Sequence, residues 1–174
     1  MEDKIKITEM VLKDSTDEEI DVMLTQYVYN YLDELTEEQY NYQYIQKIKP
    51  AIMMYYATGV IVYEVENGGF NQFLFNSSRY FIFDALEGYK LFGWNEHYNL
   101  ILEIIKEINP LKLNKSEFFE YFDKIKLQSE SYKSFSDKLN LDKFDEIFYK
   151  INDDKNIFPL LIEYVRNHYG DFVP

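Results

Sequence analysis

The fold of this chain is decided by the stretch ENGGFNQFLFNSS, residues 66–78. Two adjacent glycines, Gly68 and Gly69, separate an apolar stretch from a block rich in Phe, Asn and Gln. Because Gly adopts a positive φ without steric cost, and helices commonly stop at such a residue, Asn67-Gly68-Gly69 predicts the end of one helix. Residues 70–75 are expected to form a short helical segment beyond it. The stretch is therefore predicted to be a corner between two core helices.

The segment before the glycines is the most apolar of the chain. Residues 51–66, AIMMYYATGVIVYEVE, are apolar on almost every side of a helix, which predicts a buried central helix. Pro50 suits its first turn. After the corner, Asn76, Ser77 and Ser78 are expected to cap a helix that runs through Leu91.

The remaining chain is dominated by helical patterns. Ser15 and Thr16 each precede a Glu by three residues, the capping-box pattern, and Thr36 repeats it with Gln39 before a short helix at residues 40–48. Further helices are expected over residues 95–108, 115–128, 141–151 and 159–169. The order of the Ser-rich residues 129–140 is left open. The sequence predicts an all-α fold, with residues 1–174 as a single compact multi-helix domain.

Polar residues of the corner are predicted to be structural. Gln72 and Asn76 are four residues apart, on one face of the short helix, among Phe70 and Phe73. Buried amides need hydrogen-bond partners, so we expect this pair to bind the backbone of the neighbouring loop and fix the angle between the two helices. The motif set comprises Asn67, Gly68, Gly69, Phe70, Gln72, Phe73 and Asn76.

Motifs of catalysis do not occur in the sequence. There are no cysteines, which excludes disulfides and thiolate metal sites, and no phosphate-binding glycine motif. His97 lies on an apolar helical face, where a packed core histidine is expected, and His168 lies in the last turn of the final helix. We expect no enzyme activity, no cofactor and no metal site.

The net charge of −13 is spread unevenly along the chain. Residues 1–40 hold 12 Asp and Glu against 3 Lys. Phosphate backbones and anionic lipid would repel such a protein, so neither direct nucleic-acid binding nor membrane binding is expected. The first residues show no signal-peptide pattern, and a cytoplasmic location is expected. A basic protein is the expected partner.

Several segments resemble a known family. ENGGFNQFLFNS is similar to the hallmark of a bacterial family of small acidic helical proteins, long catalogued as a domain of unknown function. Residues 85–93, LDKFDEIFYKIND (141–153) and LLIEYVRNHYGDF (160–172) resemble its later segments, so that the resemblance covers about residues 50–173. The best-known member of that family is a DNA mimic that binds a transcription factor. The resemblance implies a DNA-binding partner, such as a transcriptional regulator.

A DNA mimic needs rows of carboxylates on a rigid face. Helical residues three or four apart lie about 5–6 Å from each other, near the scale of phosphate spacing. The acidic N-terminal helices, about residues 15–48, are therefore the expected partner-binding surface, through Asp17, Glu18, Asp21, Asp33, Glu34, Glu37 and Glu38. The alternative is that acids such as Asp17 and Glu37 only stabilise helix N-termini.

Two further functions stay open at this point. A small-molecule-binding protein or enzyme would use a pocket at the Asn-Gly-Gly corner. An immunity-like or assembly protein would bind through a Tyr-rich face that includes Tyr29, Tyr42 and Tyr44. The formation of a homodimer is also left open.

Overall fold

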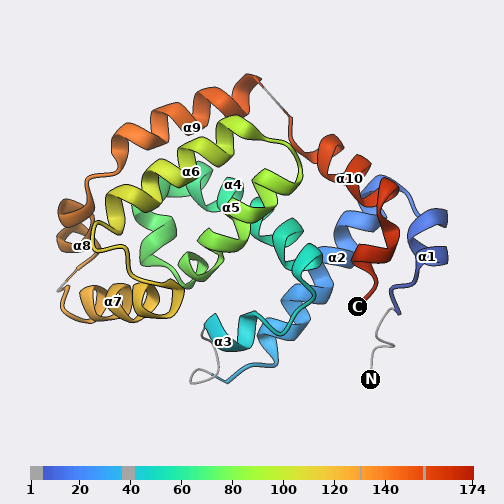
Figure 1. Ribbon diagram of the computed structural model, residues 1–174, viewed down its shortest axis with the longest axis horizontal. Coiled ribbons are helices and arrows are strands. Elements are labelled where there is room, and N and C mark those ends of the chain that lie inside the picture. The colour runs from blue at the N-terminus through green and yellow to red at the C-terminus, as the bar shows by residue number, and fades with distance from the viewer. Residues whose placement is uncertain (1–5, 37–41, 130, 155) are drawn as a thin grey trace. The chain divides into compact units, whose positions relative to one another are not determined.

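The computed structural model describes residues 6–36, 42–129, 131–154 and 156–174. Within these residues the chain forms helices and contains no strand, which confirms the all-α prediction (Figure 1). Contacts between residues group the chain into two compact units, Met1–Tyr56 with Asn156–Pro174, and Ala57–Lys155. The description of residues 1–174 as a single domain stays a prediction.

Unit 1 contains both termini of the chain. It consists of α1 (Glu9–Asp14), α2 (Asp17–Asp33), α3 (Tyr42–Ile45), the first part of α4 (Pro50–Phe75), α10 (Phe158–Asn167) and the short 3-10 helix η2 (Tyr169–Phe172). The capping box forms at Thr16, whose hydroxyl accepts the Glu19 N–H while the Glu19 carboxylate accepts the Thr16 N–H. The predicted cap at Thr36 involves Gln39, which lies outside the described residues.

The core of unit 1 forms between α2 and the C-terminal elements. Ile20, Leu24 and Val28 line the buried face of α2, and α10 packs on this helix. The ammonium of Lys49 donates hydrogen bonds to the carbonyls of Gly170 and Val173, which holds the end of the chain against the start of α4. Helix α1, which the sequence pattern did not indicate, contacts η2.

Unit 2 contains the glycine corner. It consists of the rest of α4, the 3-10 helix η1 (Ser77–Phe81), α5 (Ile82–Leu91), α6 (Asn95–Ile108), α7 (Lys115–Leu127), α8 (Tyr132–Leu139) and α9 (Asp142–Asp154). Helix α6 packs against both α5 and α9 (Figure 1). Helix α8 lies in the Ser-rich stretch whose order the sequence left open. The core is rich in aromatic rings, with Phe70, Phe73, Phe118 and Phe148 fully buried.

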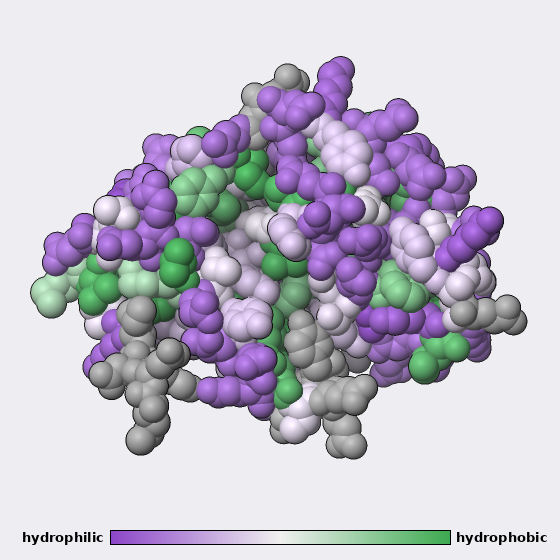
Figure 2. All heavy atoms as spheres, turned by 180° about the vertical axis from the view of Figure 1, so that it is seen from behind, coloured by the Kyte–Doolittle hydropathy of each residue, from purple (hydrophilic) through white to green (hydrophobic). Residues whose placement is uncertain are grey.

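Helix α4 is the buried helix that its composition predicts. Ile52, Met53, Ile61 and Val65 are almost completely buried, whereas Tyr63 is 71% exposed. No helix in the described part of the chain is both long and apolar enough to cross a membrane. Hydrophilic residues cover most of the face that Figure 2 shows, and hydrophobic residues form scattered patches between them.

Candidate functional site: the glycine corner and the acidic surface

The backbone of α4 breaks at its two glycines. Gly68 has φ −171° and ψ 20°, and Gly69 has φ 74° and ψ 177°. The second conformation is essentially restricted to Gly, because a Cβ would collide with the neighbouring backbone. The break leaves the N–H of Phe70 without a helical partner, and Oδ1 of Asp145 accepts it at 2.8 Å. A carboxylate of α9 thus completes the corner.

Three more side chains of α9 contact this part of α4. Oδ1 of Asp142 accepts the amide N–H of Asn71 at 2.8 Å, and the Tyr149 hydroxyl donates to the Val65 carbonyl at 2.9 Å. The ring of Phe148 packs edge-on against Phe70, with centroids 5.4 Å apart. Helix α9 therefore holds the chain on both sides of the glycines. Sequence reasoning missed these partners, because they lie more than 70 residues away and carry no motif.

The expected caps after the corner have a different role. Asn76 precedes η1, but its side chain makes no capping hydrogen bond. Instead its amide donates to Glu64 at 2.8 Å, and the Ser78 hydroxyl donates to the other oxygen of the same carboxylate at 2.6 Å. Asn76 thus occupies the N-cap position of η1, as expected, but it does not cap through its side chain, because that side chain is turned toward Glu64 on the other side of the corner. Asn76 does join the two segments, but through a carboxylate and not through backbone.

The other motif residues surround the same bend. The half-buried Gln72 side chain lies over Gly68, and Phe73 is fully buried. Asn67 is exposed, and its amide donates to the Tyr63 carbonyl one turn earlier. The polar groups of the corner are thus directed mainly at the protein itself.

The electrostatics of the corner are acidic. Burial raises the pKa of Asp145 above its ordinary value; the hydrogen bond from the Phe70 N–H acts in the opposite direction, and the nearby Asp142 raises the pKa further. Glu66 is exposed and lies two residues before Gly68, and its carboxylate accepts a long hydrogen bond from the Asn152 amide at 3.4 Å. An anionic ligand would meet three carboxylates here, which disfavours a phosphate site.

Arg79 lies just beyond the corner and is only 7% exposed. Its Nη2 lies 2.5 Å from Oδ1 of Asp123, and its Nη1 donates to the Asn76 carbonyl at 2.8 Å. The Tyr80 hydroxyl donates to the second oxygen of Asp123 at 2.9 Å. This cation therefore joins η1 to α7 and is already engaged within the fold.

Both histidines stack on a neighbouring tyrosine ring. His97 is 1% exposed, stacks on Tyr89 and contacts Oδ1 of Asn152 through its Nε2 at 2.9 Å. His168 stacks on Tyr164 at the end of α10 and contacts its carbonyl through Nδ1. Among the described residues, no group of three His, Asp or Glu side chains converges as metal ligands would.

The structure divides the acids expected to bind a partner. Asp17 accepts hydrogen bonds from both Nε and Nη2 of Arg166, at 2.9 and 2.5 Å, and Asp21 accepts the hydroxyl of the buried Tyr55 at 2.6 Å. These two carboxylates support unit 1 internally. Glu18 and Asp33 of α2 are exposed, and Glu34, which follows α2, is exposed as well but also takes part in an interaction within the chain. Glu37 and Glu38 lie outside the described residues.

The tyrosines of the alternative surface are not equivalent. Tyr29 is 56% exposed on α2. Tyr44 is half-buried, with the ammonium of Lys47 placed 3.9 Å from its ring centre. The side chain of Tyr42 lies outside the described part of the structure.

Comparison with known proteins identifies a family. The model of the family described as DMP19-like protein matches residues 46–168, from the end of α3 to the end of α10. The match includes the glycine corner and α5 to α9, and it leaves out α1 and α2. No curated protein and no solved structure matches the chain significantly. The chain belongs to the DMP19-like protein family.

Proposed function

We propose that this protein is an acidic interaction protein that binds a basic, nucleic-acid-binding protein by presenting carboxylates where DNA presents phosphates. The observation that carries this proposal is membership of the DMP19-like family, since the best-known protein of the family that the sequence resembles is a DNA mimic. The net charge of −13 supports it, because a strongly acidic surface attracts a cationic groove over long range.

The proposed contact surface is the exposed face of α2. Glu18, Val22, Tyr29 and Asp33 follow one another at spacings of four and seven residues, so they share one helical face, and all four are exposed. The acids at its two ends are about 22 Å apart, from the rise of 1.5 Å per residue. We propose that Glu18, Asp33 and Glu34 meet Lys and Arg side chains of the partner.

The glycine corner supports a protein that binds rather than one that catalyses. Its polar groups form hydrogen bonds within the fold, as Asp145 does with Phe70 and Glu64 with Asn76. The single buried arginine of the region is bound by Asp123. These contacts support a structural role for the corner.

The test compares two variants of equal charge. The first, which we call the α2 variant, carries Glu18→Gln, Asp33→Asn and Glu34→Gln. The control replaces three exposed acids of unit 2, Glu87→Gln, Glu120→Gln and Asp137→Asn. Each immobilised protein is exposed to a bacterial lysate at low salt and then washed at rising salt, and retained proteins are identified by mass spectrometry.

We expect the parent protein and the control to retain the same DNA-binding protein and to release it at high salt, because screening weakens exposed charge pairs. Duplex DNA should displace it, and the α2 variant should lose it. Retention of the same protein by the α2 variant would place the contact elsewhere. Failure of duplex DNA to compete would refute mimicry.

A further inference from the structure

Helices α6 and α9 form an antiparallel pair with an open groove between them. His97 of α6 contacts Asn152 near the end of α9, and Glu107 near the end of α6 pairs with Lys143 near the start of α9, at 3.5 Å. Residues of both helices line a groove of about 660 Å³, which we call the α6–α9 groove. Its lining on α6 runs from Glu96 to Glu103, about 10 Å or two helical turns.

The floor of the groove is apolar. Leu100 of α6 and the pair Ile147 and Ile151 of α9, one turn apart, line it. Ile147 is 46% exposed, whereas the next residue, Phe148, is completely buried. An exposed Ile at the floor of a groove is a typical anchor position for an apolar side chain of a partner.

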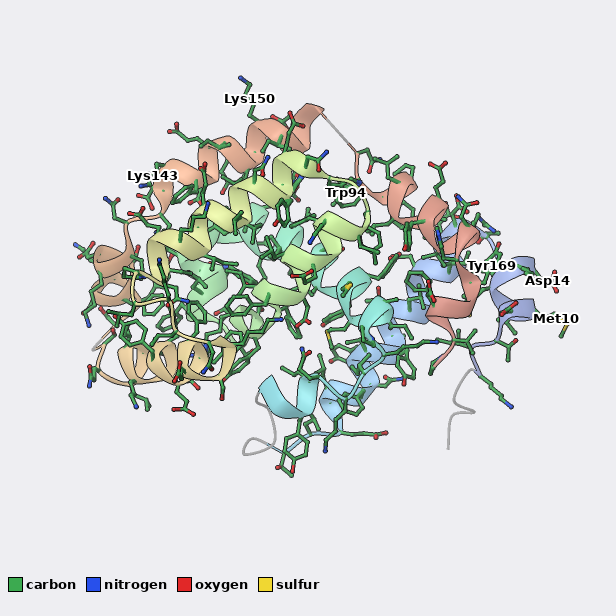
Figure 3. The ribbon with its side chains drawn as sticks, in the orientation of Figure 1. Met10, Asp14, Trp94, Lys143, Lys150 and Tyr169 are labelled. Carbon is green, nitrogen blue, oxygen red and sulfur yellow. The ribbon has the colours of Figure 1, made fainter. Side chains whose placement is uncertain are left out.

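The rim of the groove is acidic. Glu96 and Glu103 come from α6 and Glu146 from α9, whereas Lys150 is the single cation of the lining. Figure 3 shows the Lys150 side chain extending outward from α9, and a long side chain of this kind can move aside. The net charge of the lining is therefore negative.

The apolar floor and the negative charge of the rim together restrict what the groove can bind. Carboxylates on both walls exclude nucleic acid and disfavour a second copy of this acidic chain. An apolar floor between acidic walls matches the apolar stripe of a helix flanked by Lys or Arg.

We propose that the α6–α9 groove binds a basic amphipathic helix of a partner protein, with apolar side chains at spacings of three, four and seven on the floor and Lys or Arg on Glu103 and Glu146. This contact is separate from the α2 face, and it does not depend on DNA mimicry. Because both walls lie within residues 46–168, the groove belongs to the part of the chain that the family model matches.

The test uses a fluorescein-labelled helical peptide of Leu and Lys, about five turns long, with Leu at the spacings of one helical face. A peptide of the same composition, with Leu distributed around the helix, is the control for nonspecific attraction. Binding to the full-length protein is measured by fluorescence anisotropy at about 0.15 M salt, where distant charges are largely screened. Far-UV circular dichroism checks that each variant is folded.

Three results are expected. The amphipathic peptide binds at least about tenfold more tightly than its control, since only the former can bury an apolar stripe. Ile147→Ser weakens the binding of the amphipathic peptide by about tenfold, because the apolar anchor is lost. The fold stays intact, because the substituted side chain is exposed. The pair Glu103→Gln and Glu146→Gln weakens peptide binding and reduces its salt dependence, whereas Glu87→Gln with Glu120→Gln, equal in charge, does not.

Equal binding of the two peptides would overturn the proposal, as would an unchanged affinity after Ile147→Ser. A dimer of the free protein that Ile147→Ser dissociates in size-exclusion chromatography would assign the groove to a second copy instead. The α2 variant should bind the amphipathic peptide as the parent does. This separates the failure of the groove proposal from the failure of the proposed function.

Discussion

Gly69 is the position at which one added methyl group should damage the fold most specifically. Its φ of 74° and ψ of 177° are essentially limited to Gly, and forcing another residue into that region costs about 1–3 kcal/mol. A Cβ at Gly69 would also overlap Oδ2 of Asp145 and lie 2.8 Å from its Cγ. The carboxylate would have to leave, and the Phe70 N–H that it accepts would lose its partner, at a cost of about 1–3 kcal/mol.

Gly68 provides the matched control. Its φ of −171° lies outside the positive range that favours glycine, and a Cβ there would meet only the far end of the Gln72 side chain, which can rotate away. Alanine also lowers the conformational entropy of the unfolded chain, which offsets part of the cost of moving the Gln72 side chain. We therefore expect Gly69→Ala to lower the free energy of unfolding by about 2–5 kcal/mol, and Gly68→Ala to change it by less than about 1 kcal/mol.

Urea unfolding followed by the fluorescence of Trp94 measures this difference. Trp94 is the single tryptophan, is 8% exposed, and lies in the same unit as the corner, so its signal reports on that unit. With an m value of about 2 kcal/mol per molar urea, Gly69→Ala should lower the midpoint by about 1–2.5 M. Equal midpoints for the two alanine variants would refute the reasoning.

A double-mutant cycle tests the role of Asp145. Asp145→Ala removes the atom that collides with the new methyl group and already leaves the Phe70 N–H unpaired. Gly69→Ala should therefore cost less in that background, and the two effects should be non-additive by about 1–3 kcal/mol. Strict additivity would show that the carboxylate and the glycine are independent.

Substitutions at three positions test the contacts of unit 2, and each is followed by the fluorescence of Trp94. Because the pKa of Asp145 is raised in the folded state, its stability contribution is highest at low pH and falls as the pH rises through that pKa, so Asp145→Asn should flatten the stability profile above about pH 4. Parallel profiles would contradict this. Glu64→Ala leaves two donors without their acceptor and should cost about 1–3 kcal/mol, with Glu64→Gln nearer to the parent. Asp123→Ala leaves the buried Arg79 without its carboxylate and should cost about 3 kcal/mol, and a cost below that of an ordinary surface substitution would refute the structural role of this pair.

Local patterns could be predicted from sequence because each depends on residues a few positions apart. The cap at Thr16, the positive φ at Gly69 and the apolar stretch of α4 are cases of this kind. In each case the deciding interaction is within about one turn, or follows from the side chain itself. The burial of His97 was likewise indicated by its place on an apolar face.

The contacts of the candidate surfaces could not be predicted in the same way. Asp17 looked like a free surface acid, yet Arg166 binds it across 149 positions, and Asp21 accepts the hydroxyl of Tyr55 across 34. The periodicity of apolar residues shows which face of a helix is buried, but it does not specify the helix against which that face packs. The α6–α9 groove is a similar case, since it exists only where two helices pack side by side.

The sequence by itself determined that this protein is helical, acidic and bent at Gly68 and Gly69, because propensity, charge and the conformational freedom of Gly are properties of residues and their near neighbours. Only the tertiary structure decided that Asp145 supplies the acceptor for that bend and Glu64 binds the residues beyond it. A hydrogen bond between distant residues forms only when packing brings donor and acceptor within about 3 Å. The same packing decides which carboxylates form hydrogen bonds within the fold and which remain exposed to solvent.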